Sequence, residues 1–413
     1  MARGARQQDW TMNKLTKLSI EQFRNVAPTT LEFRPGINVL LGKNAAGKTT
    51  LLRLLSTALG HPEPSLQDDV LKVRYRVSGR ELDYEHTITR VLRTMPNLTI
   101  EPLREELPSL KQTDSFVFEK NGAVAVKAEV RSNEIVLEFD GQQKSVGRLD
   151  VSPSADVIWA LSLYLDDGRS PLSAAFLRSK VYGAGRMDES LDQFAALLKY
   201  EMIRVDKTLR VSPSEMPRSM VQGVLSASMP EGTSAAFAPE FLGRVARVLG
   251  YESASSRFDV EHLAPSYGRQ AVRLSNLRFF FKRPGEEISH DLLSYGQKRL
   301  LAFFAHADAS PDVIIADELV NGLHHEWITA CLKEIGDRQA FLTSQNPLLL
   351  DFLRFDSAEE VRRTFILCER TTGASGAQLI WRNPTEEEAD SFFAAYQTGI
   401  QRVSDILLTK GFW

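Results

Sequence analysis

The chain has 413 residues, of which 43% are hydrophobic and 25% charged, and its formal net charge is −3. This length suits two or three domain-sized units, and the composition is that of an ordinary globular protein. The small net charge excludes a global basic field for nucleic acid, although a local basic face is compatible with it. The two cysteines, Cys331 and Cys368, lie far apart and form no metal-ligand spacing, so a reducing cytoplasm is the expected location.

Neither end of the chain nor its interior carries a membrane signal. The N-terminus is basic but lacks the apolar core of a secretory signal, and no apolar run approaches the length of a membrane span. Patterned sequence begins just after Met12. We therefore expect residues 1–12 to be disordered, with Met12 as an alternative start.

The first patterned stretch indicates a hairpin followed by a phosphate-binding loop. Alternating residues predict strands over 17–23 and 30–33, and an apolar run predicts a third strand over 37–41. The motif G-x-x-x-x-G-K-[ST] follows directly, as Gly42-Lys43-Asn44-Ala45-Ala46-Gly47-Lys48-Thr49. Helical spacing continues from Thr50 to about residue 59. Strand, glycine loop and helix are the context that confirms this motif.

Each part of the loop has a role in binding a nucleotide. Gly42 and Gly47 let the main chain approach the phosphates, where N–H groups of the motif and of Thr50 form an anion nest at a helix N-terminus. Lys48 supplies a positive charge at the β- and γ-phosphates, and the Thr49 hydroxyl is placed to ligate Mg²⁺. We therefore predict ATP and Mg²⁺ as cofactors and Lys48 as a catalytic residue.

Two blocks with different sequence patterns follow the loop. Residues 70–140 predict an antiparallel β lobe, with strands over 70–77, 84–91, 115–118, 124–130 and 135–139. From Ser152 the pattern becomes helical, with helices expected over 155–165, 190–203 and 237–249. Ser, Pro and Met residues over 211–235 indicate a mobile loop or a linker.

The last third of the chain alternates strands and helices, which predicts a parallel sheet covered by helices. The expected elements are strands over 271–281, 312–316, 340–343, 363–368 and 377–381, and helices over 294–307, 325–336, 347–353 and 385–408. The predicted domains are an N-terminal half of a nucleotide core over 13–150, a largely helical insertion over 151–270, and a C-terminal half over 271–413.

A second acidic motif completes the predicted nucleotide site. Val313-Ile314-Ile315-Ala316-Asp317-Glu318 is an apolar strand that ends in two carboxylates, the Walker B pattern. Asp317 is predicted to hold Mg²⁺, and Glu318 to orient and deprotonate the attacking water. A buried strand with solvated acids at its end is the alternative, which the pairing with the phosphate-binding loop disfavours.

Leu293-Ser294-Tyr295-Gly296-Gln297 resembles the LSGGQ signature of ATP-binding-cassette (ABC) ATPases. A helix N-terminus with a hydroxyl and a glycine lets a phosphate come close. In the family that it resembles, this signature closes over the γ-phosphate held by a second subunit. The resemblance therefore makes Ser294, Gly296 and Gln297 candidate nucleotide contacts in a dimer. Ser294 is also expected to cap the helix that follows.

Two further segments resemble those of the RecF, chromosome-maintenance and OLD (overcoming-lysogenization-defect) branch of these ATPases. Asn321-Gly322-Leu323-His324 occupies the place of the D-loop, and we expect His324 to make a dimer contact. Leu342-Thr343-Ser344-Gln345-Asn346-Pro347 resembles their switch segment, with Gln345 in place of the switch histidine. Glutamine can donate a hydrogen bond to the γ-phosphate but cannot accept a proton at neutral pH, so slow hydrolysis is expected.

Taken together, residues 13–60 and 285–413 resemble bacterial AAA-family ATP-binding proteins of the OLD/RecF-like ABC type, many of which act in anti-phage defence. The resemblance implies an α/β fold with an ABC-type P-loop ATPase core, a mixed or parallel sheet with helices and an antiparallel β lobe. OLD nucleases carry a C-terminal Toprim nuclease domain, for which about 60 residues after the switch segment are too few. An effector is therefore expected in a separate polypeptide.

These features are compatible with three functions. The first is an ATPase that pairs head-to-tail on ATP and acts as a sensor or regulator of defence, with a nuclease or toxin in trans. The second is a RecF-like repair ATPase that binds DNA, for which the stretch from Arg273 to Arg278 is a candidate phosphate contact. Solvated cations on a half-buried strand are the favoured reading of that stretch. A transporter subunit ranks last, because the gap from Lys48 to Ser294 is too long. Arg186, after Gly183-Ala184-Gly185, is either a phosphate contact or part of an ordinary turn.

Overall fold

The computed structural model describes residues 12–92, 110–120, 122–166, 171–211, 215–266, 268–344, 346–373 and 376–412. The sequence predicts disorder for residues 1–12. Of these, residues 1–11 lie outside the described residues, and description begins at Met12. By its internal contacts the chain forms two compact units. Unit 1 contains Met1–Val181, Phe355–Gln397 and Lys410–Trp413, and unit 2 contains Tyr182–Arg354 and Thr398–Thr409. The three-part division expected from the sequence remains a prediction.

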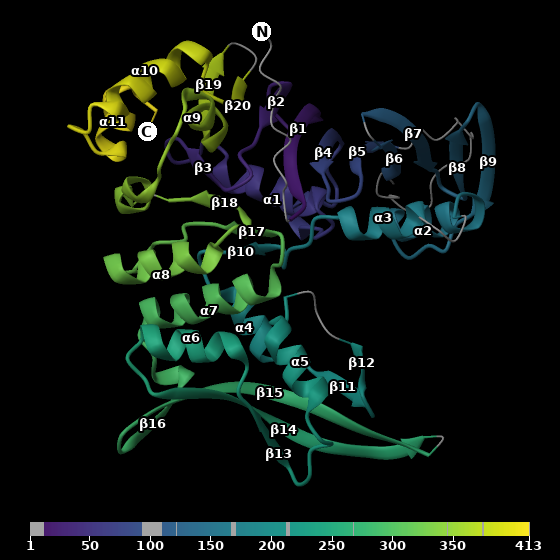
Figure 1. Cartoon of the computed structure of the whole chain (residues 1–413), viewed down its shortest axis with the longest axis vertical. Helices are drawn as coiled ribbons and strands as arrows, with labels where there is room; N and C mark the ends of the chain where they lie inside the picture. Colours follow the sequence, from purple (N-terminus) through teal and green to yellow (C-terminus); the bar gives the residue numbers. More distant parts are fainter. Residues whose placement is uncertain are drawn as a thin grey trace, which may run out of the picture. The chain divides into compact units, whose positions relative to one another are not determined.

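An eight-stranded antiparallel sheet forms the larger part of unit 1 (Figure 1). Its strand order is β2-β1-β4-β5-β6-β7-β8-β9. The bounds are β1 (Lys14–Phe23), β2 (Thr29–Glu32), β4 (Leu71–Ser78), β5 (Asp83–Leu92), β6 (Leu110–Lys120), β7 (Ala123–Val130), β8 (Glu134–Phe139) and β9 (Gln142–Gly147). The predicted hairpin and β lobe are confirmed. The edge strand β9 was not predicted, because it is exposed along almost its whole length and no alternation of apolar and polar residues marks it.

One face of this sheet is covered by two helices, α2 (Pro153–Tyr164) and α3 (Leu172–Ser179) (Figure 1). The aromatic core between the sheet and these helices explains why apolar and polar residues alternate along the strands. Phe176 of α3 packs edge-on against Tyr84, Phe116 and Phe118, with ring centroids 4.8 to 5.7 Å apart. Such contacts add to the burial of large apolar area that holds the helices on the sheet.

The rest of unit 1 is an α/β element built around the phosphate-binding loop. The strand β3 (Ile37–Leu41) pairs in parallel with β19 (Phe365–Gly373), which pairs antiparallel with β20 (Gly376–Arg382). The helices are α1 (Lys48–Ala58), α9 (Ala358–Thr364) and α10 (Glu386–Gln397), with a short 3-10 turn η1 (Pro64–Leu66) after α1. The strand expected from residue 363 begins at Phe365, because α9 extends to Thr364.

Unit 2 has three layers (Figure 1). A parallel group of strands consists of β10 (Arg186–Met187), β17 (Val313–Ala316) and β18 (Gln339–Thr343). The helices are α4 (Asp192–Leu198), α5 (Arg218–Ser226), α6 (Glu240–Val248), α7 (Tyr295–Ala309), α8 (His325–Ile335) and α11 (Val403–Thr409), with 3-10 turns η2 (His290–Leu292) and η3 (Pro347–Phe352). An antiparallel sheet follows the order β12-β11-β15-β14-β13.

This antiparallel sheet modifies the expectation of a largely helical insertion. Its strands are β11 (Met202–Val205), β12 (Thr208–Val211), β13 (Ser234–Phe237), β14 (Ser253–Ser266), β15 (Arg269–Arg283) and β16 (Glu286–Ser289). The helix expected over 190–203 ends at Leu198, and β11 pairs with the distant β15. The loop expected over 211–235 contains α5, which buries Met220 and Val224. Both differences arise because tertiary pairing and packing override a weak local pattern.

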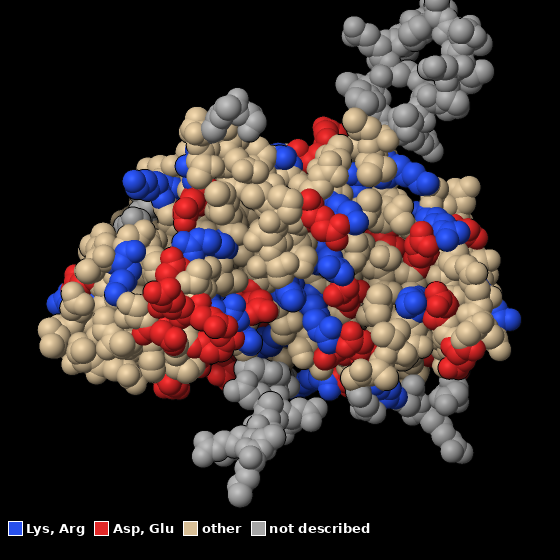
Figure 2. All heavy atoms as spheres, turned by 90° about the horizontal axis from the view of Figure 1, so that it is seen from above, with Lys and Arg blue, Asp and Glu red and all other residues tan. Residues whose placement is uncertain are grey.

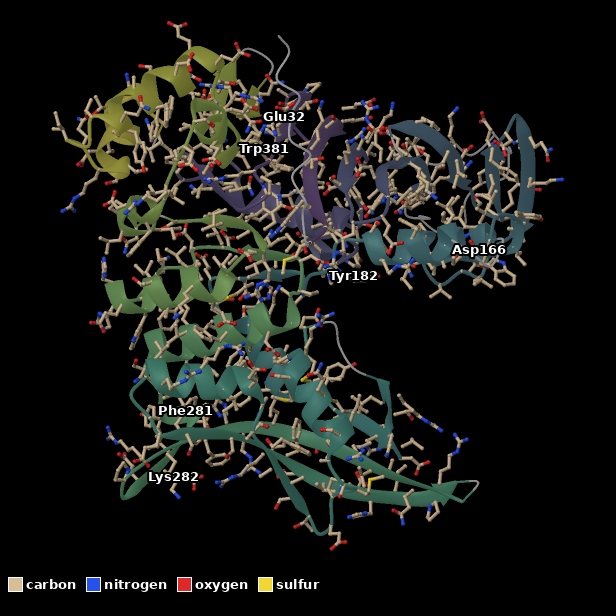
Figure 3. All side chains as sticks on the ribbon, in the orientation of Figure 1. Glu32, Asp166, Tyr182, Phe281, Lys282 and Trp381 are labelled. Carbon is tan, nitrogen blue, oxygen red and sulfur yellow. The ribbon has the colours of Figure 1, made fainter. Side chains whose placement is uncertain are left out.

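The long hairpin of β14 and β15 separates an apolar face from a charged face. Phe281 is fully buried on the side of β15 that faces the helices, whereas Lys282 is exposed on the other side (Figure 3). This alternation confirms the strand predicted over 271–281.

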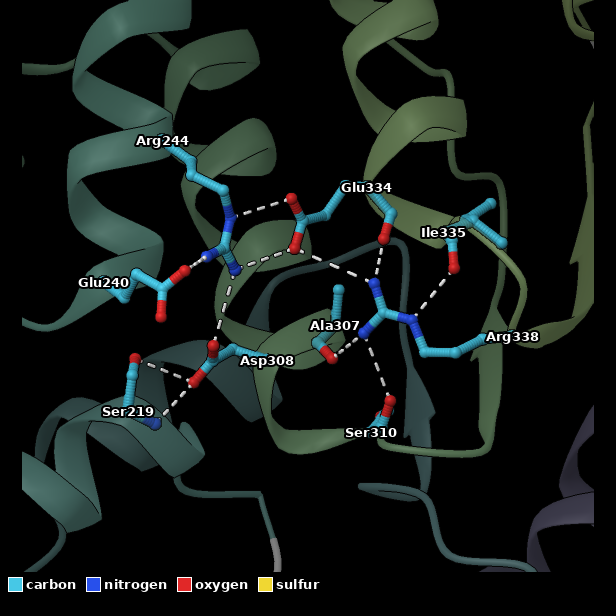
Figure 4. Close-up of polar contacts among 9 residues, drawn as sticks. All are labelled: Ser219, Glu240, Arg244, Ala307, Asp308, Ser310, Glu334, Ile335 and Arg338. Atoms are coloured by element: carbon cyan, nitrogen blue, oxygen red, sulfur yellow. Dashed lines mark hydrogen bonds and ion pairs between the residues drawn. The ribbon is translucent and has the colours of Figure 1, made fainter. Parts of the chain in front are cut away.

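An ion-pair network joins the helices of unit 2 (Figure 4). Arg244 of α6 donates to both carboxylate oxygens of Glu334 on α8, at 2.9 and 3.0 Å, and to Asp308 of α7 at 3.4 Å. Asp308 also accepts from the N–H and the hydroxyl of Ser219 at the start of α5, at 2.8 and 2.9 Å. The four helices are therefore fastened to one another by charge-assisted hydrogen bonds as well as by packing.

Both cysteines are buried, and burial raises the pKa of each thiol, that of Cys368 to about 12 and that of Cys331 further. A thiol with so high a pKa has about one thiolate in 10,000 at pH 8. We therefore expect no reaction of the native protein with a disulfide reagent at pH 8, and two reactive thiols per chain after unfolding. A thiol that reacts in the native protein contradicts this prediction.

Candidate nucleotide site

The phosphate-binding loop joins β3 to α1 in unit 1. Its two motif glycines adopt positive φ angles, 139° at Gly42 and 85° at Gly47, which favour glycine. The turn at Gly47 starts α1 at Lys48, so the N–H groups of the first helical turn point into the loop. The ammonium group of Lys48 donates to the carbonyl oxygens of Gly42 at 2.7 Å and Lys43 at 3.2 Å. The predicted residues thus form an anion nest with a lysine ammonium at it.

Neighbouring backbone and side chains enforce this loop geometry. A Cβ atom on Gly42 would lie 2.1 Å from the carbonyl oxygen of Cys368 in β19, and one on Gly47 would lie 2.8 Å from the Leu379 side chain. Trp381 of β20, labelled in Figure 3, is fully buried and donates from its indole N–H to the Ala46 carbonyl at 3.2 Å. Trp381 could not be recognised as a loop residue from the sequence, because it lies 335 residues from its partner.

A pocket of about 530 Å³ opens beside the loop in unit 1. Loop residues Gly42, Lys43, Asn44 and Ala46 line it together with the ends of β3 and β19. Its charged lining residues are Lys43, Glu369, Arg370, Arg382, Glu388 and Lys410. The excess of cations over carboxylates makes this side of the loop favourable for anions.

The Walker B pair lies in unit 2, at the end of β17. The Asp317 carboxylate accepts from the Thr343 hydroxyl at 2.6 Å through one oxygen, and its other oxygen lies 3.6 Å from the guanidinium of Arg186. Thr343 comes from the end of β18, next to β17 in the sheet. Because parallel strands bring their carboxyl ends to one edge, Asp317 and the first residues of the switch segment meet there.

The adjacent residue, Glu318, has a backbone conformation that is rare for its type. Its φ angle is +50°, in the left-handed region, and the residue is 5% exposed. The Glu318 N–H donates to the Thr343 hydroxyl at 2.7 Å. A strained residue held by its surroundings is typical of a functional site.

The signature stands at the start of α7. The Ser294 hydroxyl accepts from the Gln297 N–H at 3.4 Å, and the Gln297 side chain accepts from the Ser294 N–H at 2.9 Å. This capping box confirms the expected N-cap. A Cβ atom on Gly296 would lie 2.5 Å from the Gly322 carbonyl oxygen of the D-loop, so the two segments touch within one chain.

Of the remaining residues considered from the sequence, three lie among the described residues and one does not. His324 is the N-cap residue of α8, and its ring packs edge-on against Trp327 with centroids 4.9 Å apart. His325, left without a role by the sequence, contacts Phe352 with a similar spacing of 4.9 Å. Gln345, the residue at the switch-histidine position, lies outside the described residues. Arg186 lies in β10 beside Asp317, in a parallel strand rather than in the turn that was the alternative.

The arginines proposed as a phosphate-contacting stretch form cross-strand ion pairs. Arg273 pairs with Glu261, and Arg278 with Asp259, at 2.6 and 2.5 Å. Arg257 stacks on Phe280 and pairs with Glu287. Figure 2 displays a different face of the molecule, on which basic and acidic side chains are also interspersed. The pairing supports the favoured reading of this stretch as a half-buried strand with solvated cations.

The donor set suits the predicted metal. Mg²⁺ is usually held by one or two protein oxygens together with phosphates and water. Within unit 1 the Thr49 hydroxyl is an oxygen donor of this kind. Within unit 2 the Asp317 carboxylate is another, with one oxygen 3.6 Å from the guanidinium of Arg186. Within the described ranges, no group of three His, Cys, Asp or Glu side chains could hold a metal ion by itself.

The strand–loop–helix nest, the Walker B turn and the signature helix define an α/β, ABC-type P-loop ATPase core. The chain belongs to the family described as "AAA domain, putative AbiEii toxin, Type IV TA system", which matches residues 37–351, about three quarters of the chain. Along the described stretches, no helix is both long and apolar enough to cross a bilayer.

Similar proteins include DNA replication and repair proteins named RecF. That of Lactococcus lactis subsp. cremoris is 24% identical over 202 residues, which are 47% of this chain and 48% of the relative. That of Staphylococcus epidermidis is 39% identical over 77 residues, 18% of this chain and 21% of the relative. The alignments thus span between about a fifth and a half of these relatives. The solved structure "Crystal structure of the SmcHead bound to the C-winged helix domain of ScpA" has a TM-score of 0.41 and 10% identity, with 89% of this chain and 98% of that chain covered.

Proposed function

We propose that this protein is an ATP-hydrolysing switch that pairs head-to-tail with a second copy. The observation that carries the proposal is the contact of Gly296 in the signature with Gly322 in the D-loop, next to the Walker B turn of the same chain. In this arrangement the P-loop of one copy and the signature of the other enclose one nucleotide. ATP then joins two copies, and hydrolysis releases them.

In the proposed reaction each predicted residue has a distinct task. The loop N–H groups and Lys48 bind the β- and γ-phosphates, while Thr49 and Asp317 would hold Mg²⁺. A metal ion held by them would supply positive charge against the charge that develops on the phosphates. Glu318 orients the attacking water and accepts its proton. Ser294, Gly296, Gln297 and His324 serve the second copy. Gln345 donates a hydrogen bond to the γ-phosphate without titrating, which favours slow turnover.

Glu318→Gln tests this mechanism because it removes the general base and keeps the shape of the side chain. We expect the turnover number to fall about 100- to 10,000-fold. We also expect the mass measured by light scattering to double from the 46.3 kDa of one chain when ATP and Mg²⁺ are added. The control is Glu387→Gln on the exposed first turn of α10, which should hydrolyse ATP at the wild-type rate. A monomer that ATP leaves unchanged removes the pairing mechanism.

The biological role that we favour is that of a sensor or regulator in a bacterial anti-phage defence system, with a separate nuclease or toxin as effector. The description of the family, which names a toxin of a toxin–antitoxin system, supports this role. A gene for a nuclease, a reverse transcriptase or a toxin beside this one would strengthen it. Its decisive test is loss of phage protection when Lys48→Ala replaces the wild-type protein in cells.

A RecF-like role in DNA repair is the second candidate, and the similarity to RecF over 202 residues favours it. A titration of labelled DNA at several salt concentrations distinguishes the two roles. Affinity that falls steeply with salt indicates phosphate contacts and supports the repair role. No binding at low salt removes it.

A further inference from the structure

A buried arginine ties the signature helix to the Walker B turn. Arg299 lies in the second turn of α7 and has no exposed surface. Its guanidinium donates to four main-chain carbonyl oxygens. These belong to Leu319 at 3.1 Å, Glu189 at 2.8 Å, Asp317 at 2.8 Å and, at short range, Glu318.

Three of the four acceptors form the turn that carries the predicted metal ligand and base. A carbonyl oxygen buried without a donor costs about 1–3 kcal/mol, so the turn keeps the shape that satisfies all three. The planar fork of arginine can reach several acceptors in fixed directions, whereas the ammonium of lysine is a compact point charge. The residue type at position 299 therefore matters for the geometry as well as for the charge.

The middle residue of this turn needs to be held. Glu318 has its left-handed φ angle of +50°, which is unfavourable for a residue with a Cβ atom. Arg299 bonds its carbonyl oxygen and Thr343 bonds its N–H. Because the backbone angles fix the direction of the Cα–Cβ bond, these two contacts set the direction in which the Glu318 side chain leaves the main chain.

The same arginine is connected to the signature motif. The hydroxyl of Tyr295, the third residue of the motif, donates at 2.9 Å to the Glu189 carbonyl that also accepts from Arg299. Gly296 meets Gly322 three residues beyond Leu319. The signature turn, the D-loop and the Walker B turn of one chain are thus joined by short contacts.

We propose that Arg299 is a positioning residue, which holds Glu318 in its left-handed conformation and couples the signature helix to the base of the same chain. This role rests on the proposed ATPase function. When two copies pair, the signature of one chain covers the nucleotide that its partner copy binds. Arg299 connects this signature to Glu318 of the same chain, which acts on the nucleotide in that chain's own P-loop. Arg299 does not touch the substrate and acts through Glu318.

The molecule contains a matched control for a purely structural clamp. Arg338 donates to main-chain carbonyls at the other end of α7, among them Ser310 at 3.2 Å, and to Ile335 at 2.9 Å (Figure 4). It is 15% exposed on its side chain, and its other main-chain acceptors are Ala307 and Glu334. It therefore resembles Arg299 in burial and in bonding but does not contact the Walker B turn.

The test compares Arg299→Lys with Arg338→Lys in the full-length protein. We expect both variants to melt below the wild type, because each loses hydrogen bonds to buried carbonyls. Only Arg299→Lys should lower kcat for ATP hydrolysis, by about 10- to 100-fold, since a small misplacement of a catalytic group has such an effect. Its KM should stay within about twofold, because the P-loop is intact. Added to Glu318→Gln, Arg299→Lys should cause no further loss of kcat, because both act through one carboxylate.

Equal losses of kcat in the two lysine variants, or a further loss in the double variant, overturn the proposal. If the wild-type protein does not hydrolyse ATP, the proposed function and the role of Arg299 fail together. If the wild type and Arg299→Lys hydrolyse ATP at the same rate, only the role of Arg299 fails. Thr343→Val is the second variant if Arg299→Lys does not fold. It removes the hydrogen bonds of the Thr343 hydroxyl with the Glu318 N–H and the Asp317 carboxylate and leaves Arg299 in place. An unchanged kcat in this variant would show that the geometry of the turn does not limit hydrolysis, which also overturns the proposal.

Discussion

Lys48→Ala is expected to lower kcat/KM for ATP by about 100- to 1000-fold, the usual effect of losing a donor that stabilises charge in the transition state. The ammonium group lies at the mouth of the anion nest, bonded to the carbonyl oxygens of Gly42 and Lys43. The methyl group of alanine leaves the phosphates with the N–H groups alone. Nucleotide affinity, measured with a fluorescent ATP analogue, should fall together with turnover.

The control for this variant is Lys72→Ala on β4. Lys72 forms an exposed ion pair with Glu21, and exposed pairs contribute little. Its removal should leave both the affinity and the melting temperature close to those of the wild type. ATP hydrolysis by Lys48→Ala at more than a tenth of the wild-type rate contradicts the assignment of the loop as the nucleotide site.

Gly42→Ala should have the largest effect on stability. The added Cβ atom would lie 2.1 Å from the carbonyl oxygen of Cys368, on a backbone with a φ angle of 139°. Since the clash is with main chain, β3 and β19 must move apart at the point where they pair. We expect a loss of at least about 3 kcal/mol of stability, in the range of the most damaging point mutations, and a loss of nucleotide binding. Thermal unfolding followed by circular dichroism, with and without ATP, measures both.

A glycine in open space provides the comparison. Gly243 lies inside α6 with nothing within 4 Å of a Cβ atom. Alanine there should raise the midpoint of unfolding slightly, because it favours the helix by about 0.5–1 kcal/mol. If Gly42→Ala and Gly243→Ala change the midpoint of unfolding equally, the contact with Cys368 is not what requires glycine at position 42.

The predictions for the Arg299 and Glu318 variants share one physical basis. Both depend on a carboxylate held at a strained backbone position, so both predict changes in kcat rather than in binding. The loop variants instead predict a loss of nucleotide binding together with the loss of turnover. Measuring affinity and turnover for all variants therefore separates the two halves of the proposed site.

The β lobe was predictable because its strands alternate over a buried aromatic core, as with Phe116 and Phe118 in β6. The sheet of unit 2 was partly missed because β11 has four residues and takes its stability from pairing with β15, about 70 positions away in the chain. Short strands of this kind carry too little local signal to be distinguished from a helix end. Likewise, α5 was hidden by Ser, Pro and Gly residues around its two buried positions.

By itself the sequence determined the phosphate-binding loop, the Walker B acids and the signature cap, because each depends on residue types at fixed local spacing. Gly42, Lys48 and Ser294 were found in this way. The tertiary structure alone decided what fixes these segments in place. Trp381 supports the loop from β20, Thr343 holds Asp317 from the next strand, and Arg299 bonds a turn about 20 residues away. Hydrogen bonds between distant segments leave no periodic pattern, so only the folded chain reveals that the turn carrying Glu318 is bonded to the signature helix.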